Sequence, residues 1–219
     1  MALLPKPLSC YGCPLYGLSP MGYMPAAAGN GDYGVLLVGE ALGEQEELAG
    51  TAFVGKAGAK LNTALRSRGL EREKFWIDNT LRCRPPDNKL VGQPYEAEAI
   101  RRCAHHLDST IAKLKPKCIV AMGATALRRV LDYPLYEPQE PHLSYVEWSS
   151  KYQTWVISTY HPSFLMRGNQ HLTGVFLFAL EHAVEIAANG FSFDKPEVVT
   201  DPPIDYTSAW VREFEAALA

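Results

Sequence analysis

The sequence predicts a three-layer α/β/α fold with a central, mainly parallel four-stranded sheet. Two observations support this prediction. Short apolar runs, typical of buried parallel strands, alternate along the chain with longer segments of helical character. The polar motifs of the chain also follow directly after the expected strands. In open α/β sheets, binding sites lie beyond the carboxyl ends of the strands, so we expect these motifs to meet there.

The first half of the chain supplies two strands and two helices. The unbroken apolar run at 34–39 predicts a fully buried strand, and 75–79 predicts a second, shorter one. Apolar residues three and four positions apart predict a helix over 57–69, which a glycine ends. A longer helix is expected over 95–114.

The second half continues the alternation. The apolar run at 118–122 predicts a third strand that ends at a glycine, followed by a helix over 124–131. A fourth strand is expected at 155–158, entered from a hairpin through 146–148. An amphipathic pattern predicts a final helix over 172–188.

Composition is that of an ordinary globular protein. The chain has 219 residues, of which 47% are hydrophobic and 21% charged. It has no run of 18 apolar residues, and its N-terminus lacks the apolar core of a signal peptide. We therefore expect a cytoplasmic monomer with no membrane partner. Five cysteines in a reducing compartment argue against a disulfide framework.

The net charge of −3 is unevenly distributed. Residues 181–219 carry eight acidic and two basic side chains, whereas residues 1–180 have a net charge of +3. A mildly basic body can bind a phosphate backbone through local patches. Most charges on any domain form a solvated surface, so charge alone does not decide between these interpretations.

Four short motifs carry the candidate chemistry. They are the acidic glycine-rich turn 39–47 with the segment 50–58, the strand-end Asn79, the segment 81–88 (LRCRPPDN) and the tripeptide 161–163 (HPS). Each motif alone is weak evidence, because a loop glycine, asparagine or histidine is common. The strand-end asparagine offers one acceptor and two donors, which suit the edge of a pyrimidine.

Taken together and in this order, the motifs resemble those of the iron–sulfur uracil-DNA glycosylases of family 4. The match runs from about residue 10 to residue 180, and FVGKAG and CRPPxN are its most specific segments. The resemblance implies the uracil-DNA glycosylase fold and activity. Leu42 stands where the family usually has proline, a departure that affects the turn carrying Glu40 and hence the expected rate.

Four cysteines have the spacing of the family's cluster ligands: Cys10, Cys13, Cys83 and Cys103. Four thiolates bind either zinc or a [4Fe–4S] cluster, and spacing alone slightly favours zinc. The resemblance implies the [4Fe–4S] cluster. Its expected role is structural, because residues 1–33 have too little apolar surface to pack unaided. Cys118 lies in an apolar strand and is expected to be buried and inert.

The resemblance also implies how uracil is excised from DNA. A glycosylase must first remove its base from the stack. Phe53 is expected to stack on the flipped uracil, and Asn79 to bind its Watson–Crick edge. Glu40 is expected to orient the attacking water. His161 is expected to donate a hydrogen bond to uracil O2, where negative charge develops.

Further residues are expected to contact the base and the DNA strand. Ala41 and Glu46 are expected at the base, with Glu46 near the position of a thymine methyl group. Leu165 is the candidate wedge that fills the gap in the stack, with Met166 next in line. The other expected DNA contacts are Arg82, Arg84, Ser163 and Arg167.

Two alternatives differ from this interpretation. One is a related uracil-recognising enzyme, either a subgroup that crosslinks to DNA through a loop histidine or a family 5 glycosylase. The matching loop at 89–95 has no histidine, and family 5 lacks the acidic GE start. The other is a non-catalytic or weakly active uracil- or DNA-binding module of a larger replication or repair protein. The presence of Glu40, Asn79 and His161 argues against lost activity.

The expected domain division falls near residue 190. Residues 1–190 form the glycosylase domain with its cluster-bound N-terminal segment. Residues 191–219 combine an acidic Pro- and Asp-rich linker with a short amphipathic helix. This helix either packs on its own domain or leads into a further replication or repair domain of a longer polypeptide.

Overall fold

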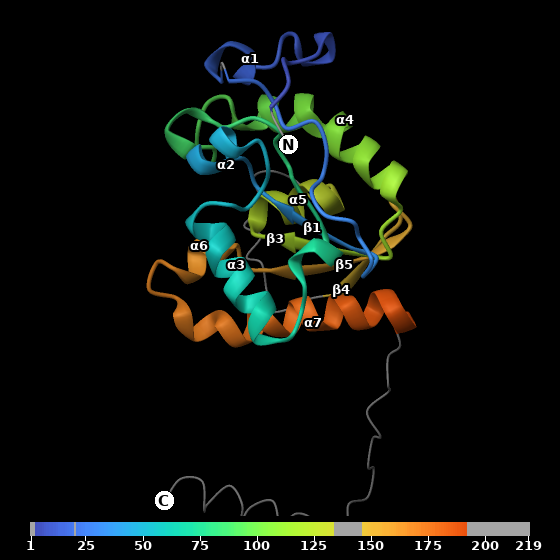
Figure 1. Ribbon diagram of the computed structural model, residues 1–219. Helices are drawn as coiled ribbons and strands as arrows, with labels where there is room; N and C mark the ends of the chain where they lie inside the picture. The colour runs from blue at the N-terminus through green and yellow to red at the C-terminus, as the bar shows by residue number, and fades with distance from the viewer. Residues whose placement is uncertain (1–2, 20, 134–145, 192–219) are drawn as a thin grey trace, which may run out of the picture.

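A five-stranded sheet forms the centre of the molecule (Figure 1). The computed structural model describes residues 3–19, 21–133 and 146–191. The strands are β1 (Val35–Gly39), β2 (Trp76–Asn79), β3 (Cys118–Met122), β4 (Val146–Ser149) and β5 (Thr154–Thr159), in the order β2-β1-β3-β5-β4. The first four strands in this order run parallel, and β4 runs antiparallel to β5.

The predicted number of strands is wrong by one. The segment expected as one arm of a hairpin is β4, which joins the sheet by pairing Val146 with Ile157 and Ser149 with Thr154. This strand is short and only partly buried. Its apolar pattern therefore does not distinguish an edge strand from a hairpin arm outside the sheet. The mainly parallel sheet itself is confirmed.

Helices lie between successive strands, before β1 and after β5. They are α1 (Leu15–Leu18), α2 (Glu44–Ala49), α3 (Lys56–Ser67), α4 (Glu96–Leu114), α5 (Ala124–Leu131), α6 (Pro162–Leu165) and α7 (Thr173–Asn189). Short 3-10 turns lie at Leu8–Cys10, Arg72–Lys74, Pro86–Asn88 and Gln170–Leu172. The four predicted helices are confirmed to within two residues. Helices α1, α2 and α6, of four to six residues, are too short to show helical periodicity.

The helices cover both faces of the sheet, which confirms the three-layer prediction. In Figure 1, α4 and α5 lie above the sheet, and α3 and α7 lie below it. Successive residues of a strand point to opposite faces. Accordingly, Leu36 and Val38 pack in a core with α4 and α5 residues, whereas Val35 and Leu37 pack with α3 and α7 residues.

The first part of the N-terminal segment, residues 3–19, lies away from the sheet near one end of α4 (Figure 1), whereas Ala28 pairs with Ile77 of β2. Leu15 of α1 joins a third, smaller core with Leu81 and Ile100, which also contains two of the four candidate cluster cysteines. The Lys6 ammonium donates to the carbonyl oxygens of Leu15 at 2.6 Å and Tyr16 at 2.8 Å. These contacts fix α1 against the segment that precedes it.

The stretch Gln170–Asn189 is long and apolar enough to cross a membrane, judged by length and composition alone. In the structure, α7 packs on β1, β3 and β5 and buries Phe176, Leu180 and Ile186. A core helix of an α/β domain needs such an apolar face, so its hydropathy gives no indication of a membrane span.

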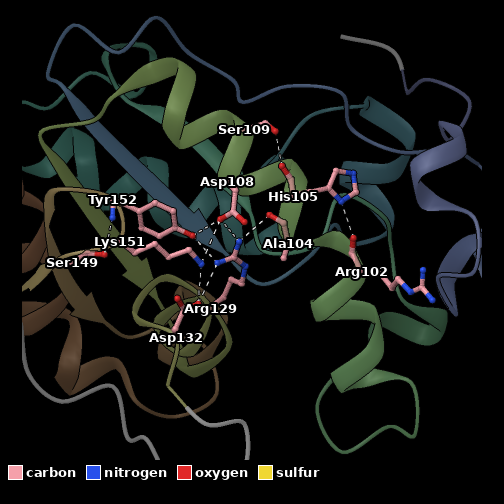
Figure 2. Close-up of polar contacts among 10 residues, drawn as sticks. All are labelled: Arg102, Ala104, His105, Asp108, Ser109, Arg129, Asp132, Ser149, Lys151 and Tyr152. Atoms are coloured by element: carbon pink, nitrogen blue, oxygen red, sulfur yellow. Dashed lines mark hydrogen bonds and ion pairs between the residues drawn. The ribbon is translucent and has the colours of Figure 1, made fainter.

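A buried arginine joins α4, α5 and the β4–β5 hairpin (Figure 2). Arg129 donates to the Asp108 carboxylate at 2.5 Å, to the Ala104 carbonyl at 2.9 Å and to the Tyr152 hydroxyl at 2.7 Å. These charged hydrogen bonds hold α5 in place. The first turn of α5 carries Thr125, which contacts the candidate site described below.

The predicted tail begins at the limit of the described residues. Phe191 packs against Trp155 of β5, with ring centroids 4.6 Å apart. The predicted linker and amphipathic helix lie outside the described residues from position 192 onward.

Candidate active site

The parallel strands bring the candidate residues to one edge of the sheet. Glu40 directly follows β1, Asn79 ends β2, and His161 lies two residues beyond β5. Gly123 follows β3, and its amide donates to the carbonyl of Thr159 at 2.8 Å. The carboxyl ends of parallel strands form a common rim, and the motifs meet there as predicted.

A pocket of about 260 Å³ opens at this rim. It is lined by Glu40, Ala41, Leu42, Gly43, Glu46, Phe53, Ala57, Pro85, Asn88, His161 and Ser163. Five of the six residues predicted to act on or bind the base therefore line one cavity. The sixth, Asn79, is not among the residues that line this cavity, but its Oδ1 atom and the Phe53 ring both lie next to Gly39. Leu42, at the family's usual proline position, is buried and contributes to this wall.

Two glycines allow Phe53 to approach the sheet. A Cβ atom on Gly39 would lie 2.5 Å from both the Phe53 ring and the Asn79 Oδ1 atom, and one on Gly58 would collide with the Phe53 carbonyl. Phe53 adopts a positive φ of 55°, which is strained for a bulky side chain. Its ring centroid lies 5.5 Å from that of His161. Strain of this kind is typical of residues held in place for a function.

Asn79 has an unpaired acceptor. Its side chain is 1% exposed, and its Oδ1 atom is buried without a hydrogen-bond partner among the described residues. Leaving a buried acceptor unpaired costs about 1–3 kcal/mol. An unpaired buried acceptor beside a pocket leaves a place for a donor that a ligand would supply.

Glu40 is held by a threonine from the neighbouring helix. The Thr125 hydroxyl donates to the Glu40 carboxylate at 2.8 Å. Burial raises the pKa of Glu40 above its ordinary value, and the hydrogen bond from Thr125 opposes this shift. The carboxylate is therefore fixed in direction at the pocket wall.

His161 is a neutral hydrogen-bond donor at neutral pH. The backbone amide of Ser163 lies 3.2 Å from Nδ1, and the Ser163 hydroxyl lies 2.8 Å from it. Because an amide N–H can only donate, Nδ1 accepts and the proton lies on Nε2. Burial, and secondarily the charge of Arg167, lower the pKa of His161 to about 4. Its Nε2–H group therefore remains available to a ligand in the pocket.

Glu46 closes the loop that carries Phe53. Its Oε1 atom accepts from the backbone amides of Val54 at 3.0 Å and Gly55 at 2.8 Å. These bonds satisfy amides at the start of α3, where a helix leaves donors unpaired. The predicted role of Glu46 near a thymine methyl group stays a prediction.

A groove of about 800 Å³ adjoins the pocket. The residues that line both cavities are Glu40, Asn88, His161 and Ser163. Lys89 and Arg167 add two positive charges to the groove. A groove with positively charged side chains, next to a pocket that can hold a single base, is suited to binding a nucleic-acid strand.

The predicted wedge Leu165 is wrong. Its side chain is fully buried in the core, where α6 packs against α3, so it cannot enter a base stack. Met166, the second candidate, is 41% exposed. The spacing after the HPS motif identifies the segment, but the turn of α6 decides which side chain points outward.

The prediction that Arg82 contacts DNA is also wrong. Arg82 is 2% exposed and donates to the Asp78 carboxylate at 2.5 Å, to the Thr110 hydroxyl at 2.5 Å and to the Met24 carbonyl at 3.0 Å. It therefore ties β2 to α4 and to the N-terminal segment. Its neighbour Arg84 is partly exposed, and the predicted contact of Arg84 with DNA stays a prediction.

The four candidate cysteines surround one enclosed cavity, which is lined by Cys10, Cys13, Cys83 and Cys103 together with Lys6, Arg102 and His106. Burial raises the pKa of Cys83 and that of Cys103 to about 12. The Arg82 amide lies 3.4 Å from the sulfur of Cys103, and His106 Nε2 lies 3.3 Å from that of Cys10. The fifth cysteine, Cys118, is fully buried in β3, as predicted.

The arrangement of possible metal ligands around this cavity is as follows. Within residues 3–19, 21–133 and 146–191, no three His, Cys, Asp or Glu side chains are close enough to hold a single metal ion. Four thiols that line one cavity are the ligand set of either a zinc ion or a [4Fe–4S] cluster.

Two site residues escape prediction from the sequence. Thr125 follows β3, the one parallel strand end with no recognised motif. Thr125 could have been predicted only from the general expectation that every parallel strand contributes residues to the rim at its carboxyl end. Asn88 is the last residue of CRPPxN, but the motif does not show that this residue lines both cavities.

Comparison with known proteins agrees with this geometry. The model of the uracil DNA glycosylase superfamily matches residues 27–183. The type-4 uracil-DNA glycosylase of Thermotoga maritima is 36% identical, over 74% of this chain and 80% of that protein. The type-4 uracil-DNA glycosylase of Archaeoglobus fulgidus is 34% identical, over 71% and 77% respectively.

A type-5 relative is more distant. The type-5 uracil-DNA glycosylase of Pyrobaculum aerophilum is 28% identical over 51% of this chain and 46% of that protein. The family match and the two type-4 relatives therefore agree on the family of this chain. The chain belongs to the uracil-DNA glycosylase superfamily and, within it, to the type-4 uracil-DNA glycosylases.

Proposed function

We propose that this protein flips uracil out of DNA and hydrolyses its N-glycosidic bond, leaving an abasic site. The observation that carries the proposal is the buried, unpaired Oδ1 atom of Asn79 beside Phe53. Uracil offers a donor at N3–H and an acceptor at O4, which complement the two ends of the asparagine amide. Cytosine offers the reverse pattern, so the same amide rejects it.

The neighbouring side chains supply the chemistry. Phe53 stacks on the flipped base, and the Glu40 carboxylate orients a water molecule for attack on the sugar carbon. As the glycosidic bond breaks, negative charge develops on uracil O2, and the neutral His161 donates a hydrogen bond to it from Nε2. A donor placed in this way contributes about 3–4 kcal/mol to transition-state stabilisation.

The adjoining groove binds the DNA strand. Lys89 and Arg167 place positive charge along it, where phosphates of the bound strand would lie. Met166 is the exposed apolar side chain at the position suited to fill the gap left by the flipped base.

We further propose that Cys10, Cys13, Cys83 and Cys103 hold a [4Fe–4S] cluster. The four thiols share one cavity, and the Arg82 amide points a hydrogen-bond donor toward one of them. The bound cluster supplies a covalent cross-link between the N-terminal segment, the loop after β2 and α4. A small core of this kind gains its stability from such a link.

The function is tested by measuring the free base released from DNA. Purified protein is incubated with an oligonucleotide that contains a single deoxyuridine, and uracil is quantified by mass spectrometry. We expect catalytic turnover on this substrate and none on the matched thymidine oligonucleotide. Binding to uracil DNA without any release of base would instead support the non-catalytic alternative. The expected monomeric state and cytoplasmic location stay predictions.

A further inference from the structure

Two nitrogen atoms lie close to sulfur atoms of the candidate cluster cavity. One is the Arg82 backbone amide, 3.4 Å from the sulfur of Cys103. The other belongs to a side chain, because His106 Nε2 lies 3.3 Å from the sulfur of Cys10. Cys103 and His106 are three residues apart on α4, so they share one face of this helix, and both line the cavity. The histidine therefore reaches the cavity from a regular element of the fold.

The chemistry of a cluster ligand decides which partner donates in the contact between His106 and Cys10. A cysteine that binds iron is a thiolate, which has no proton and can only accept a hydrogen bond. His106 then carries a proton on Nε2 and donates it to the Cys10 sulfur. Groups around a metal site commonly orient its ligands through hydrogen bonds of this kind.

Neighbouring rings hold the imidazole of His106 in place. Tyr23 of the N-terminal segment packs against it, with ring centroids 5.3 Å apart. The ring of His105 lies 3.9 Å from it, also measured between centroids. A side chain that is already packed against two rings loses little conformational entropy when it makes a further contact.

The adjacent His105 provides a comparison within the same helix. Its Nδ1 atom lies 2.9 Å from the Arg102 carbonyl, and because a carbonyl only accepts, Nδ1 carries a proton (Figure 2). Its Nε2 atom lies 3.2 Å from the Ser9 hydroxyl. The two nitrogens of His105 thus contact groups other than the cysteine sulfurs, and His105 does not line the cavity.

The segment that carries Cys10 has several exposed side chains. Leu8 and Tyr11 are 89% and 74% exposed, and Cys13 is only partly buried. Cys10 itself is buried, and the contact with His106 covers one side of its sulfur. A hydrogen bond at this sulfur therefore bears on the charge of the ligand and on the access of solvent to it.

We propose that His106 donates a hydrogen bond from Nε2 to the Cys10 sulfur of the cluster, and that this bond raises the reduction potential of the cluster and slows its loss. The inference rests on the [4Fe–4S] cluster proposed above. Reduction adds negative charge that the ligand sulfurs share, so a donor to one of them stabilises the reduced form more than the oxidised form. His106 is a positioning residue for the cofactor.

The test measures the cluster directly. The full chain is purified without oxygen, and the midpoint potential is determined by titration with dithionite, followed by electron paramagnetic resonance. Iron release is followed through the absorbance of a coloured iron chelator. The variants are His106→Phe, which keeps a ring beside Tyr23 but has no donor, and His106→Gln, whose amide can still donate. His105→Phe is the matched control at the neighbouring position.

We expect His106→Phe to shift the equilibrium between the reduced and oxidised cluster about tenfold toward the oxidised form, which lowers the potential by about 59 mV for one electron. Iron should leave this variant about tenfold faster than it leaves wild type, because the ligand has lost its supporting hydrogen bond. His106→Gln should recover most of both losses. His105→Phe should match wild type in both measurements.

An unchanged potential and an unchanged rate of iron release in His106→Phe would overturn the proposal. Equal shifts in His106→Phe and His106→Gln, or in His106→Phe and His105→Phe, would also overturn it, because packing rather than the donor would then be responsible. If His106→Phe holds no cluster, retention of the cluster by His106→Gln supports the proposal, and its loss from both variants overturns it.

The iron content and the uracil release of wild type are measured separately. Wild type without iron would refute the cluster, and this inference with it. Wild type with a cluster that is insensitive to His106→Phe would refute this inference alone. Absence of uracil release from a protein whose cluster responds to His106→Phe would refute the glycosylase proposal and leave this one standing.

Discussion

His161 illustrates how a single residue is prepared for catalysis by its neighbours. Burial keeps its imidazole neutral, and Ser163 fixes which nitrogen carries the proton. A neutral donor suits an oxygen that gains charge only in the transition state, because it costs no proton transfer. Ser163 is thus a positioning residue in our account, rather than the DNA contact that the family resemblance implies.

We expect Ser163→Ala to lower the single-turnover rate of uracil release about fivefold while DNA affinity changes less than about twofold. The substitution removes one hydrogen bond to His161 Nδ1, worth about 1 kcal/mol, and so weakens the selection of the Nε2–H tautomer. Rates and affinities are measured on the same deoxyuridine oligonucleotide. A loss confined to affinity, with a shallower salt dependence, would show that Ser163 binds phosphate after all.

The pH dependence separates Glu40 from His161. Burial raises the pKa of Glu40, so this carboxylate is protonated as the pH falls through a value above that of an ordinary glutamate. The pKa of His161 is lowered to about 4, so His161 stays neutral over the same range. We therefore expect the loss of activity at low pH, the acid limb of the pH–rate profile, to result from protonation of Glu40.

In Glu40→Gln, the low remaining rate should be independent of pH from about pH 8 to about pH 5, whereas wild type loses activity toward the acid end. The rate is measured under single-turnover conditions, with folding checked by circular dichroism at each pH. Persistence of the wild-type acid limb in Glu40→Gln would assign that limb to another group.

At the level of single residues, the sequence motifs predict the composition of the pocket well. Glu40, Ala41, Glu46, Phe53 and His161, which the family resemblance implies as residues at the base, all line it. What spacing does not fix is the direction of each side chain. Arg82 and Leu165 turn inward, since one has a buried carboxylate partner and the other faces the core.

Among the elements, the loop between α2 and α3 shapes the pocket. Phe53 sits against Gly58 in the first turn of α3, and Glu46 of α2 holds the loop from the other side. A side chain at position 58 has no room, because its Cβ would meet the backbone of Phe53. Position 174, in the first turn of α7, has open space.

We expect Gly58→Ala to reduce uracil release at least tenfold and to lower the free energy of unfolding by about 1–3 kcal/mol, because the loop must move. The matched change Gly174→Ala should leave activity unchanged and raise stability by up to about 1 kcal/mol, as alanine favours a helix. Stability is measured by urea unfolding. Full activity in Gly58→Ala would mean that Phe53 need not be held where the structure places it.

Elements of 12 or more residues, such as α3, α4 and α7, are predictable because their apolar faces repeat several times. The short helices α2 and α6 are not, although both carry site residues. Strand β4 shows the same limit at a sheet edge, where partial burial weakens the pattern. Tertiary contacts, rather than local periodicity, decide these elements.

For the whole molecule, the four cysteines unite segments that are far apart in the sequence. They connect the N-terminal segment, the loop after β2 and α4 around one cavity. The small third core there contains few buried side chains. We expect the stability of this part of the molecule to depend on the bound cluster.

Protein purified without oxygen should be brown, with broad absorbance near ~400 nm and about four iron atoms per chain. Cys83→Ser should lose this iron and make the N-terminal segment sensitive to protease. Cys118→Ser should keep both the colour and the protease resistance, because Cys118 is buried in β3 away from the cavity. A colourless protein with one tightly bound zinc ion would contradict the cluster assignment.

The central claim is that Asn79 selects uracil, and the most direct measurement is the identity of the base released by Asn79 variants. Oligonucleotides with a single uracil or cytosine are incubated with wild type, Asn79→Ala and Asn79→Asp, and the free bases are quantified by mass spectrometry. We expect wild type to release uracil alone and Asn79→Ala to release it at least about 100-fold more slowly. Asn79→Asp should lose uracil release and gain detectable cytosine release, since its carboxylate accepts from the cytosine amine. Uracil release at the wild-type rate by both variants would contradict the account.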